Sequence, residues 1–113
     1  MSALVVAIVG GCGGSSAYDA NRTAVCLNKH RVRTKVGPKV QGGYGEWLQI
    51  ITAQFSSRTV TDLWFYPSSS DARAGQGLVR YPDVRTEFGN NVQWVWHKPV
   101  PHRADALIRS CLR

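Results

Sequence analysis

The C-terminal segment carries the pattern that most restricts how this chain can fold. Apolar residues recur there at the helical spacing i, i+3, i+4, i+7 and i+8, at Ala104, Leu107, Ile108, Cys111 and Leu112. This spacing predicts an amphipathic α-helix, and Pro101 suits its first turn. Because a helix cannot bury its own apolar face, the rest of the chain must provide a surface that covers it.

The middle of the chain predicts such a surface, because its apolar residues alternate as in β-strands. Residues 47–55 place four of them on one face at period two, at Trp47, Ile51, Ala53 and Phe55. Residues 56–58 are expected to form the turn of a hairpin. The second strand, 59–67, is apolar on both faces after Asp62, which is typical of a strand in the centre of a sheet.

Two further strands and one loop are predicted outside this hairpin. Residues 32–36 form a short strand, and residues 89–98 a longer one whose buried face carries Val92, Trp94 and Trp96. Residues 37–45 contain four Gly and one Pro, so we expect a loop there.

Two more helices complete the expected elements. Residues 17–31 place Ala17, Ala20, Ala24 and Leu27 on one stripe, with Ser16 or Asp19 as the N-cap. In residues 68–81, Ser68 and Asp71 have the spacing of a capping box in which Asp replaces Glu, and Ala74, Leu78 and Tyr81 form a stripe. The order α-β-β-β-α-β-α predicts one α+β domain over residues 17–113. Its antiparallel or mixed sheet would have about four strands, with the helices packed on it.

The chain is strongly basic, with 14 Lys and Arg against 7 Asp and Glu and a formal net charge of +7. Such a balance favours anionic partners such as phosphate polymers, lipid headgroups or acidic wall polymers. The densest basic stretch is residues 28–39, whose candidate anion-binding residues are Lys29, Arg31, Arg33, Lys35 and Lys39. The alternative, which the pattern favours, is a solvated helix end and loop, because cations stabilise a helix C-terminus.

Tryptophan offers a second candidate surface, formed by Trp47, Trp64, Trp94 and Trp96. These side chains could stack on sugars or bases, but the favoured interpretation is core, since strands of a small sheet need large residues on the side that faces the helices. Catalytic motifs are lacking in the sequence. His30, His97 and His102 have no metal-ligand spacing, and no C-x-x-C, G-x-S-x-G or phosphate-loop motif is present. We therefore expect no catalytic residue, cofactor or metal.

The first residues form an apolar run that stops at a cysteine. Ala3–Val9 are too few to span a membrane, which takes about 20 residues. Val9-Gly10-Gly11-Cys12 resembles the lipobox of bacterial lipoproteins, in which the Cys thiol receives a diacylglyceryl group and the signal is cut before it. The resemblance implies a signal segment at 1–11, lipidation of Cys12 and a Gly/Ser tether at 12–16. The alternative is a buried strand that ends in a Gly-rich turn, with Cys12 as a small hydrophobe.

Lipidation of Cys12 would leave two of the three cysteines, Cys26 and Cys111, as a pair. Export would place them where disulfides persist, and the bond would join the first and last helices. The alternative is two buried thiols. The sequence also resembles small secreted proteins and lipoproteins of high-GC Gram-positive bacteria, in which a Cys-Leu helix near the start is matched by one at the end. The matching residues here are Cys26-Leu27 and Cys111-Leu112, and the likeness implies no activity.

Together these features predict a lipid-anchored protein on the extracytoplasmic face of the cell membrane, or a secreted one if Cys12 is not lipidated. It would act as a binding module for an anionic polymer or an envelope protein rather than as an enzyme. The alternatives are a basic protein that binds nucleic acid or a wall polymer, and a small hydrolase. A hydrolase would need a cleft with convergent polar groups.

Overall fold

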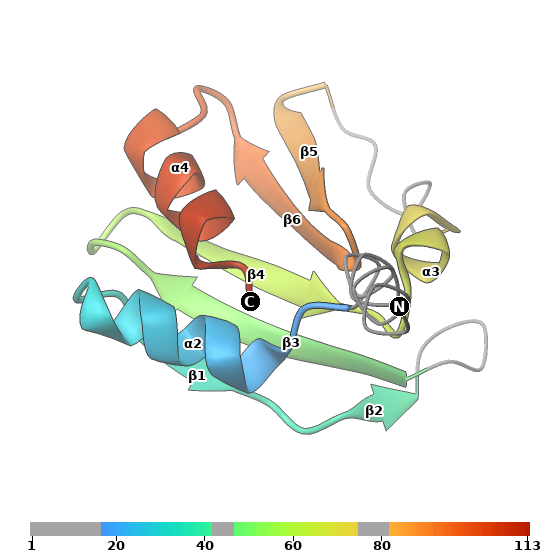
Figure 1. Cartoon of the computed structure of the whole chain (residues 1–113). Helices are drawn as coiled ribbons and strands as arrows, with labels where there is room; N and C mark the ends of the chain where they lie inside the picture. The colour runs from blue at the N-terminus through green and yellow to red at the C-terminus, as the bar shows by residue number, and fades with distance from the viewer. Residues whose placement is uncertain (1–16, 42–46, 75–81) are drawn as a thin grey trace, which may run out of the picture.

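The chain folds into one antiparallel sheet with two helices lying across the same face (Figure 1). The structure is a computed structural model, and it describes residues 17–41, 47–74 and 82–113. The helices are α2 (Ala20–Lys29), α3 (Ser69–Ala74) and α4 (His102–Cys111). The strands are β1 (Arg33–Val36), β2 (Val40–Gln41), β3 (Trp47–Gln54), β4 (Val60–Phe65), β5 (Val84–Gly89) and β6 (Val92–His97). The predicted α+β class is therefore confirmed.

The sheet has the strand order β1-β3-β4-β6-β5, and β2 pairs with the same strand β3 as β1 does. Every pairing is antiparallel. The predicted hairpin is present as β3 and β4, and β4 is central, as its two apolar faces indicated. Its register sets Ile51 opposite Leu63, and Leu63 lies opposite Trp94 of β6. Ile51, Leu63 and Trp94 thus form one apolar row across three neighbouring strands.

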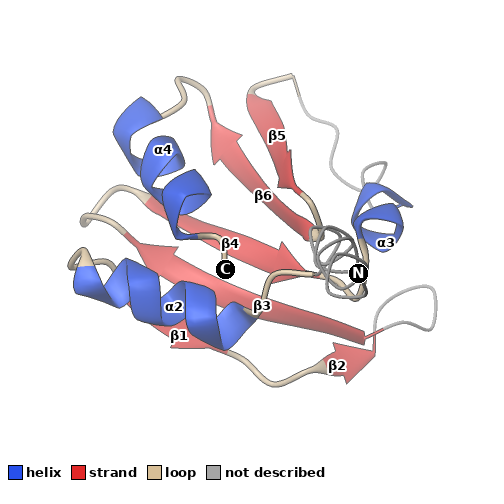
Figure 2. Ribbon diagram, in the orientation of Figure 1, coloured by secondary structure: helices blue, strands red, loops and turns tan. Residues whose placement is uncertain are grey.

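The core lies between this face and the two long helices (Figure 2). Leu27 of α2 and Ile108 of α4 are fully buried against Ile51, Leu63 and Trp94. Burying one such side chain contributes about 1.5–3 kcal/mol. The C-terminal stripe therefore does what its spacing predicted, because it packs α4 onto the sheet.

Polar bonds fix the two ends of the domain beside each other. Asp19 is the N-cap of α2, and its Oδ2 accepts the N–H of Arg22 at 2.9 Å. The backbone N–H of Arg113 donates to Thr23 Oγ1 at 3.2 Å. The fully buried Asn91 side chain accepts the N–H of Tyr18 at 2.6 Å and donates to that residue's carbonyl at 3.0 Å. These bonds hold the start and the end of the domain on the sheet.

The sheet has six strands, whereas the sequence predicted about four. β2 lies inside the predicted loop 37–45, and β5 was not predicted. The last strand begins at Val92 rather than at residue 89, because Asn90 has a φ of 51° and belongs to the turn that joins β5 to β6. Asparagine tolerates this left-handed conformation better than most residues. The element order is consequently α-β-β-β-β-α-β-β-α.

The helices also differ from their predicted limits. α2 covers Ala20–Lys29 rather than 17–31, and Ala17 is exposed outside it. In α3 the buried alanine is Ala72, while Ala74 is exposed. Ser68 caps α3 by accepting the N–H of Asp71 at 3.2 Å, as predicted. The rest of the predicted helix, with Leu78 and Tyr81, lies outside the described residues.

Candidate functional site

The turn that follows helix α2 contains a basic residue, Arg31, in an uncommon backbone conformation. The N–H of Arg31 donates to the carbonyl of Asn28 at 3.0 Å, and the N–H of Val32 donates to that of Leu27 at 3.1 Å. These two bonds form a Schellman motif, whose left-handed position is usually occupied by glycine. Here Arg31 occupies it, with a φ of 65°. The left-handed conformation costs an ordinary residue about 1–2 kcal/mol, so the side chain of Arg31 is a candidate for a functional role.

Arg31 lies where two hollows of the surface meet. The larger, of about 610 Å³, lies between the end of α2, the β3–β4 turn and the start of α4, and His30, Arg31 and Arg103 contribute its basic groups. The second is lined by Arg31 and Arg33 together with Ser56 and Ser57 of the same turn. The two hollows are neighbours, because Arg31, Phe55 and Ser56 line both.

A third hollow lies beside α2 and Arg113, which follows α4. His30 lines both this hollow and the large one. We call the three hollows together the basic groove, and its basic residues are Arg22, Lys29, His30, Arg31, Arg33, Arg103 and Arg113. None of the described residues that line the groove is Asp or Glu. Its positive charge is therefore not neutralised by acidic side chains of its own lining.

The structure separates the five predicted anion-binding residues into two groups. Lys29, Arg31 and Arg33 line the basic groove. Lys39 instead lies over the ring of Trp47, with its Nζ 4.4 Å from the ring centroid. Lys35 is exposed on β1 opposite Thr52. Arg22, Arg103 and Arg113 complete the groove. Arg22 lies earlier in α2, outside the basic stretch 28–39, and Arg103 and Arg113 lie in and just after α4, so the basic stretch alone did not indicate them.

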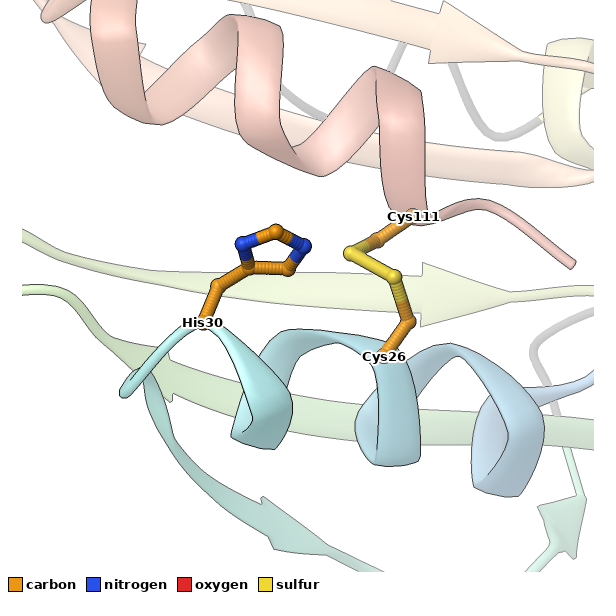
Figure 3. A group of neighbouring side chains, drawn as sticks. All are labelled: Cys26, His30 and Cys111. Atoms are coloured by element: carbon orange, nitrogen blue, oxygen red, sulfur yellow. A yellow bond between two sulfur atoms is a disulfide. The ribbon is translucent and has the colours of Figure 1, made fainter.

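A cysteine pair and a histidine lie between the two long helices (Figure 3). Cys26 of α2 and Cys111 of α4 are at disulfide distance, with their Cα atoms 5.4 Å apart. The structure thus confirms that the two predicted partners lie at disulfide distance. Cys111 is fully buried, whereas Cys26 is partly exposed in the basic groove. His30 lies one helical turn after Cys26, and its ring is beside the two sulfurs.

Asp105 of α4 is the acceptor for two buried indoles. Nε1 of Trp94 and Nε1 of Trp96 each donate to its Oδ1 at 2.8 Å, and Arg109 donates to its Oδ2 at 3.0 Å. Burial by itself would raise the pKa of Asp105. The hydrogen bonds from Trp96, Trp94 and Arg109, with the positive charge of Arg109, outweigh burial and lower the pKa below its ordinary value. This carboxylate fastens α4 to the sheet.

The four tryptophans do not share one surface. Trp94 and Trp96 are buried in the core, as the favoured interpretation expected, and Trp47 packs against it. Trp64 lies opposite Ile50 on the face of the sheet away from α2 and α4. The hypothesis that the four tryptophans form one stacking surface is therefore wrong.

Comparison of the chain with protein-family models, with curated proteins and with solved structures finds no match. Among the helices that the structure describes, none has the length and apolar character needed to cross a membrane. The arrangement of the side chains is thus the basis for an inference about function.

Proposed function

We propose that this chain is a lipid-anchored protein of the cell envelope whose domain binds an anionic polymer. The observation that carries the proposal is the basic groove, in which seven basic side chains line three neighbouring hollows without an acidic one among the described lining residues. Nearby cations without anions raise the local concentration of a polyanion and release its counterions when it binds.

The shape of the groove favours a polymer over a single small anion. Its cations are spread over three hollows that share the lining residues His30 and Arg31, so successive charges of one polymer could each meet a cation. Arginine, the commonest of these residues, presents several N–H donors in a planar fork that matches phosphate and carboxylate oxygens. Ser56 and Ser57 add hydroxyl groups at the end beside Arg33.

Two features support a place outside the cytoplasm. The lipobox-like Val9–Cys12 lies outside the described residues, and it would attach the chain to the membrane through Cys12. The Cys26–Cys111 pair at disulfide distance suits an oxidising compartment. An envelope polymer with phosphate or carboxylate groups is therefore the proposed ligand, in preference to nucleic acid. No observation favours the small hydrolase.

The decisive variant for the binding function is Arg31→Gly. Glycine adopts the left-handed conformation of residue 31 without penalty, so the fold should keep or gain stability, by about 1 kcal/mol. Binding of fluorescent polyphosphate, measured by anisotropy at several salt concentrations, should weaken, and the slope of log K against log salt should fall by about 1. Arg73→Ala is the matched control, because it removes one charge from α3, outside the groove.

The proposal predicts a steep salt dependence for the wild type and a loss confined to groove variants. Equal binding by wild type and Arg31→Gly, or an equal loss in Arg73→Ala, would contradict a site in the groove. A duplex DNA bound more tightly than polyphosphate and poly-glutamate at the same salt concentration would reassign the ligand to nucleic acid.

The anchor is tested separately through Cys12. Expressed in a Gram-positive host, the wild type should partition into the detergent phase, and its N-terminal peptide should carry the mass of a diacylglyceryl group. Cys12→Ser should remain in the aqueous phase or keep its signal segment, while Ser15→Ala should behave as wild type. If wild type and Cys12→Ser fractionate alike, Cys12 is not the anchor.

A further inference from the structure

Cys26, His30 and Cys111 form a compact group of metal-ligand atoms. The two sulfurs and the nearer ring nitrogen of His30 all lie within 4.8 Å of one another. Cys26 and His30 are four residues apart, at the end of α2, and Cys111 faces them from α4 (Figure 3). Residues four apart share one face of a helix, which is the spacing that many helical metal sites use.

The backbone already holds these ligands at a suitable separation. Zinc binds thiolate sulfur at about 2.3 Å and imidazole nitrogen at about 2.0 Å, so two ligands of one ion lie at most about 4.6 Å apart for two sulfurs and about 4.3 Å for sulfur and nitrogen. The three ligand atoms here lie within 4.8 Å of one another, so small rotations of the side chains bring them into that range. When the disulfide is reduced, the two sulfurs need only move apart by rotation of their side chains, because the helices hold the two Cα atoms 5.4 Å apart.

The positive side chains around Cys26 favour a metal complex whose ligands neutralise the charge of the ion. Arg22, Lys29 and Arg113 line the same hollow as Cys26, so any ion bound there lies beside positive side chains. Two thiolates neutralise a divalent ion, so a zinc complex has the same net charge as the disulfide that it replaces. A metal held by neutral ligands would instead add two charges beside these cations.

We propose that Cys26, His30 and Cys111 form a redox-gated binding site for Zn²⁺. A dithiol reductant transfers two electrons and two protons to the disulfide, becomes a disulfide itself and leaves two thiols. Zn²⁺ then binds both sulfurs and the neutral imidazole, and it releases the two thiol protons to solvent. The three protein ligands leave a fourth position for water, as in zinc sites with Cys₂His ligands. The site does not depend on the anionic polymer.

Cobalt spectroscopy on the full chain tests the site, in a Cys12→Ser background so that Cys26 and Cys111 are its only thiols. The protein is reduced with dithiol, desalted without oxygen and titrated with Co²⁺. The reduced protein should show thiolate-to-cobalt charge-transfer absorption, which Zn²⁺ displaces, and the oxidised protein should show none. His30→Ala should weaken Zn²⁺ binding by roughly 100-fold, since even loss of an outer-shell partner costs about 10–100-fold. His102→Ala, at the exposed start of α4, should bind as wild type.

Two results would overturn the site. One is a reduced wild type without charge-transfer absorption. The other is a reduced His30→Ala that binds Zn²⁺ as tightly as the wild type. Far-UV circular dichroism follows the fold in each sample. If reduction unfolds the chain, Zn²⁺ should refold the wild type at a lower concentration than His30→Ala, and equal concentrations would also reject the proposal.

Discussion

At the scale of single residues, Asp105 shows how one carboxylate can organise a small core. It accepts from two indoles that are 0% and 3% exposed. Its second oxygen binds Arg109, which also pairs with Glu87 of β5. An isolated aspartate would be costly in this position, whereas three donors make it a fastening between helix and sheet.

Two substitutions of Asp105 should therefore destabilise the fold to different extents. Asp105→Ala leaves two indole N–H groups without their acceptor, at about 1–3 kcal/mol for each buried group, so we expect a loss of about 2–6 kcal/mol. Asp105→Asn keeps a carbonyl acceptor and should lose less. Because the folded-state pKa is lowered, the charged form contributes its full stability above the ordinary value of 3.8 and loses it as the pH falls through the lower folded-state value.

Urea unfolding at neutral pH and at about pH 2.5 measures both effects. The difference in unfolding free energy between wild type and Asp105→Asn should shrink at the lower pH. The carboxyl of the unfolded chain is then largely protonated, so part of the stability that the lowered folded-state pKa provides is lost. A difference that stays constant over this range would show that the charge of Asp105 does not stabilise the fold. Asp83→Asn, an exposed carboxylate beside His97, serves as the control.

At the scale of elements, local patterns predicted the segments that bury one clear face. The β3–β4 hairpin and α4 have such patterns, and both are present. β5 was missed because all but one of its side chains are only half-buried, so the alternation of its residues is weak. Its hairpin signal is the asparagine pair 90–91, which the prediction included in the following strand. β2 has two exposed residues and exists only through its pairing with β3.

The candidate sites follow the same division between local and tertiary information. Lys29, Arg31 and Arg33 were predictable because they are neighbours in the chain. Arg103 and Arg113 join them only because α4 packs beside α2, which no local pattern reports. The thiol–imidazole group is similar, since Cys26 and His30 have a readable helical spacing, but Cys111 is 85 residues from Cys26.

At the scale of the whole molecule, the Cys26–Cys111 pair ties the first long helix to the last. It closes a loop with a sequence separation of 85, and the same two helices are also joined by the bond from Arg113 to Thr23. In the chain-entropy model, closing a loop of this length removes unfolded-state freedom worth about 4.5 kcal/mol. For a domain of this size that is a large part of the total stability.

Reduction should therefore lower the melting temperature by roughly 20–35 °C while the helices and sheet remain recognisable below it. Circular dichroism melts of oxidised and reduced protein in metal-free buffer measure the shift. A Cys26→Ala/Cys111→Ala variant should melt at a lower temperature than the oxidised wild type and should not respond to the reductant.

In the exported protein, alkylation under denaturing, non-reducing conditions should label neither cysteine. Complete labelling of both would mean that the chain folds with free thiols, and the entropic account of its stability, together with the disulfide's support for export, would then fail.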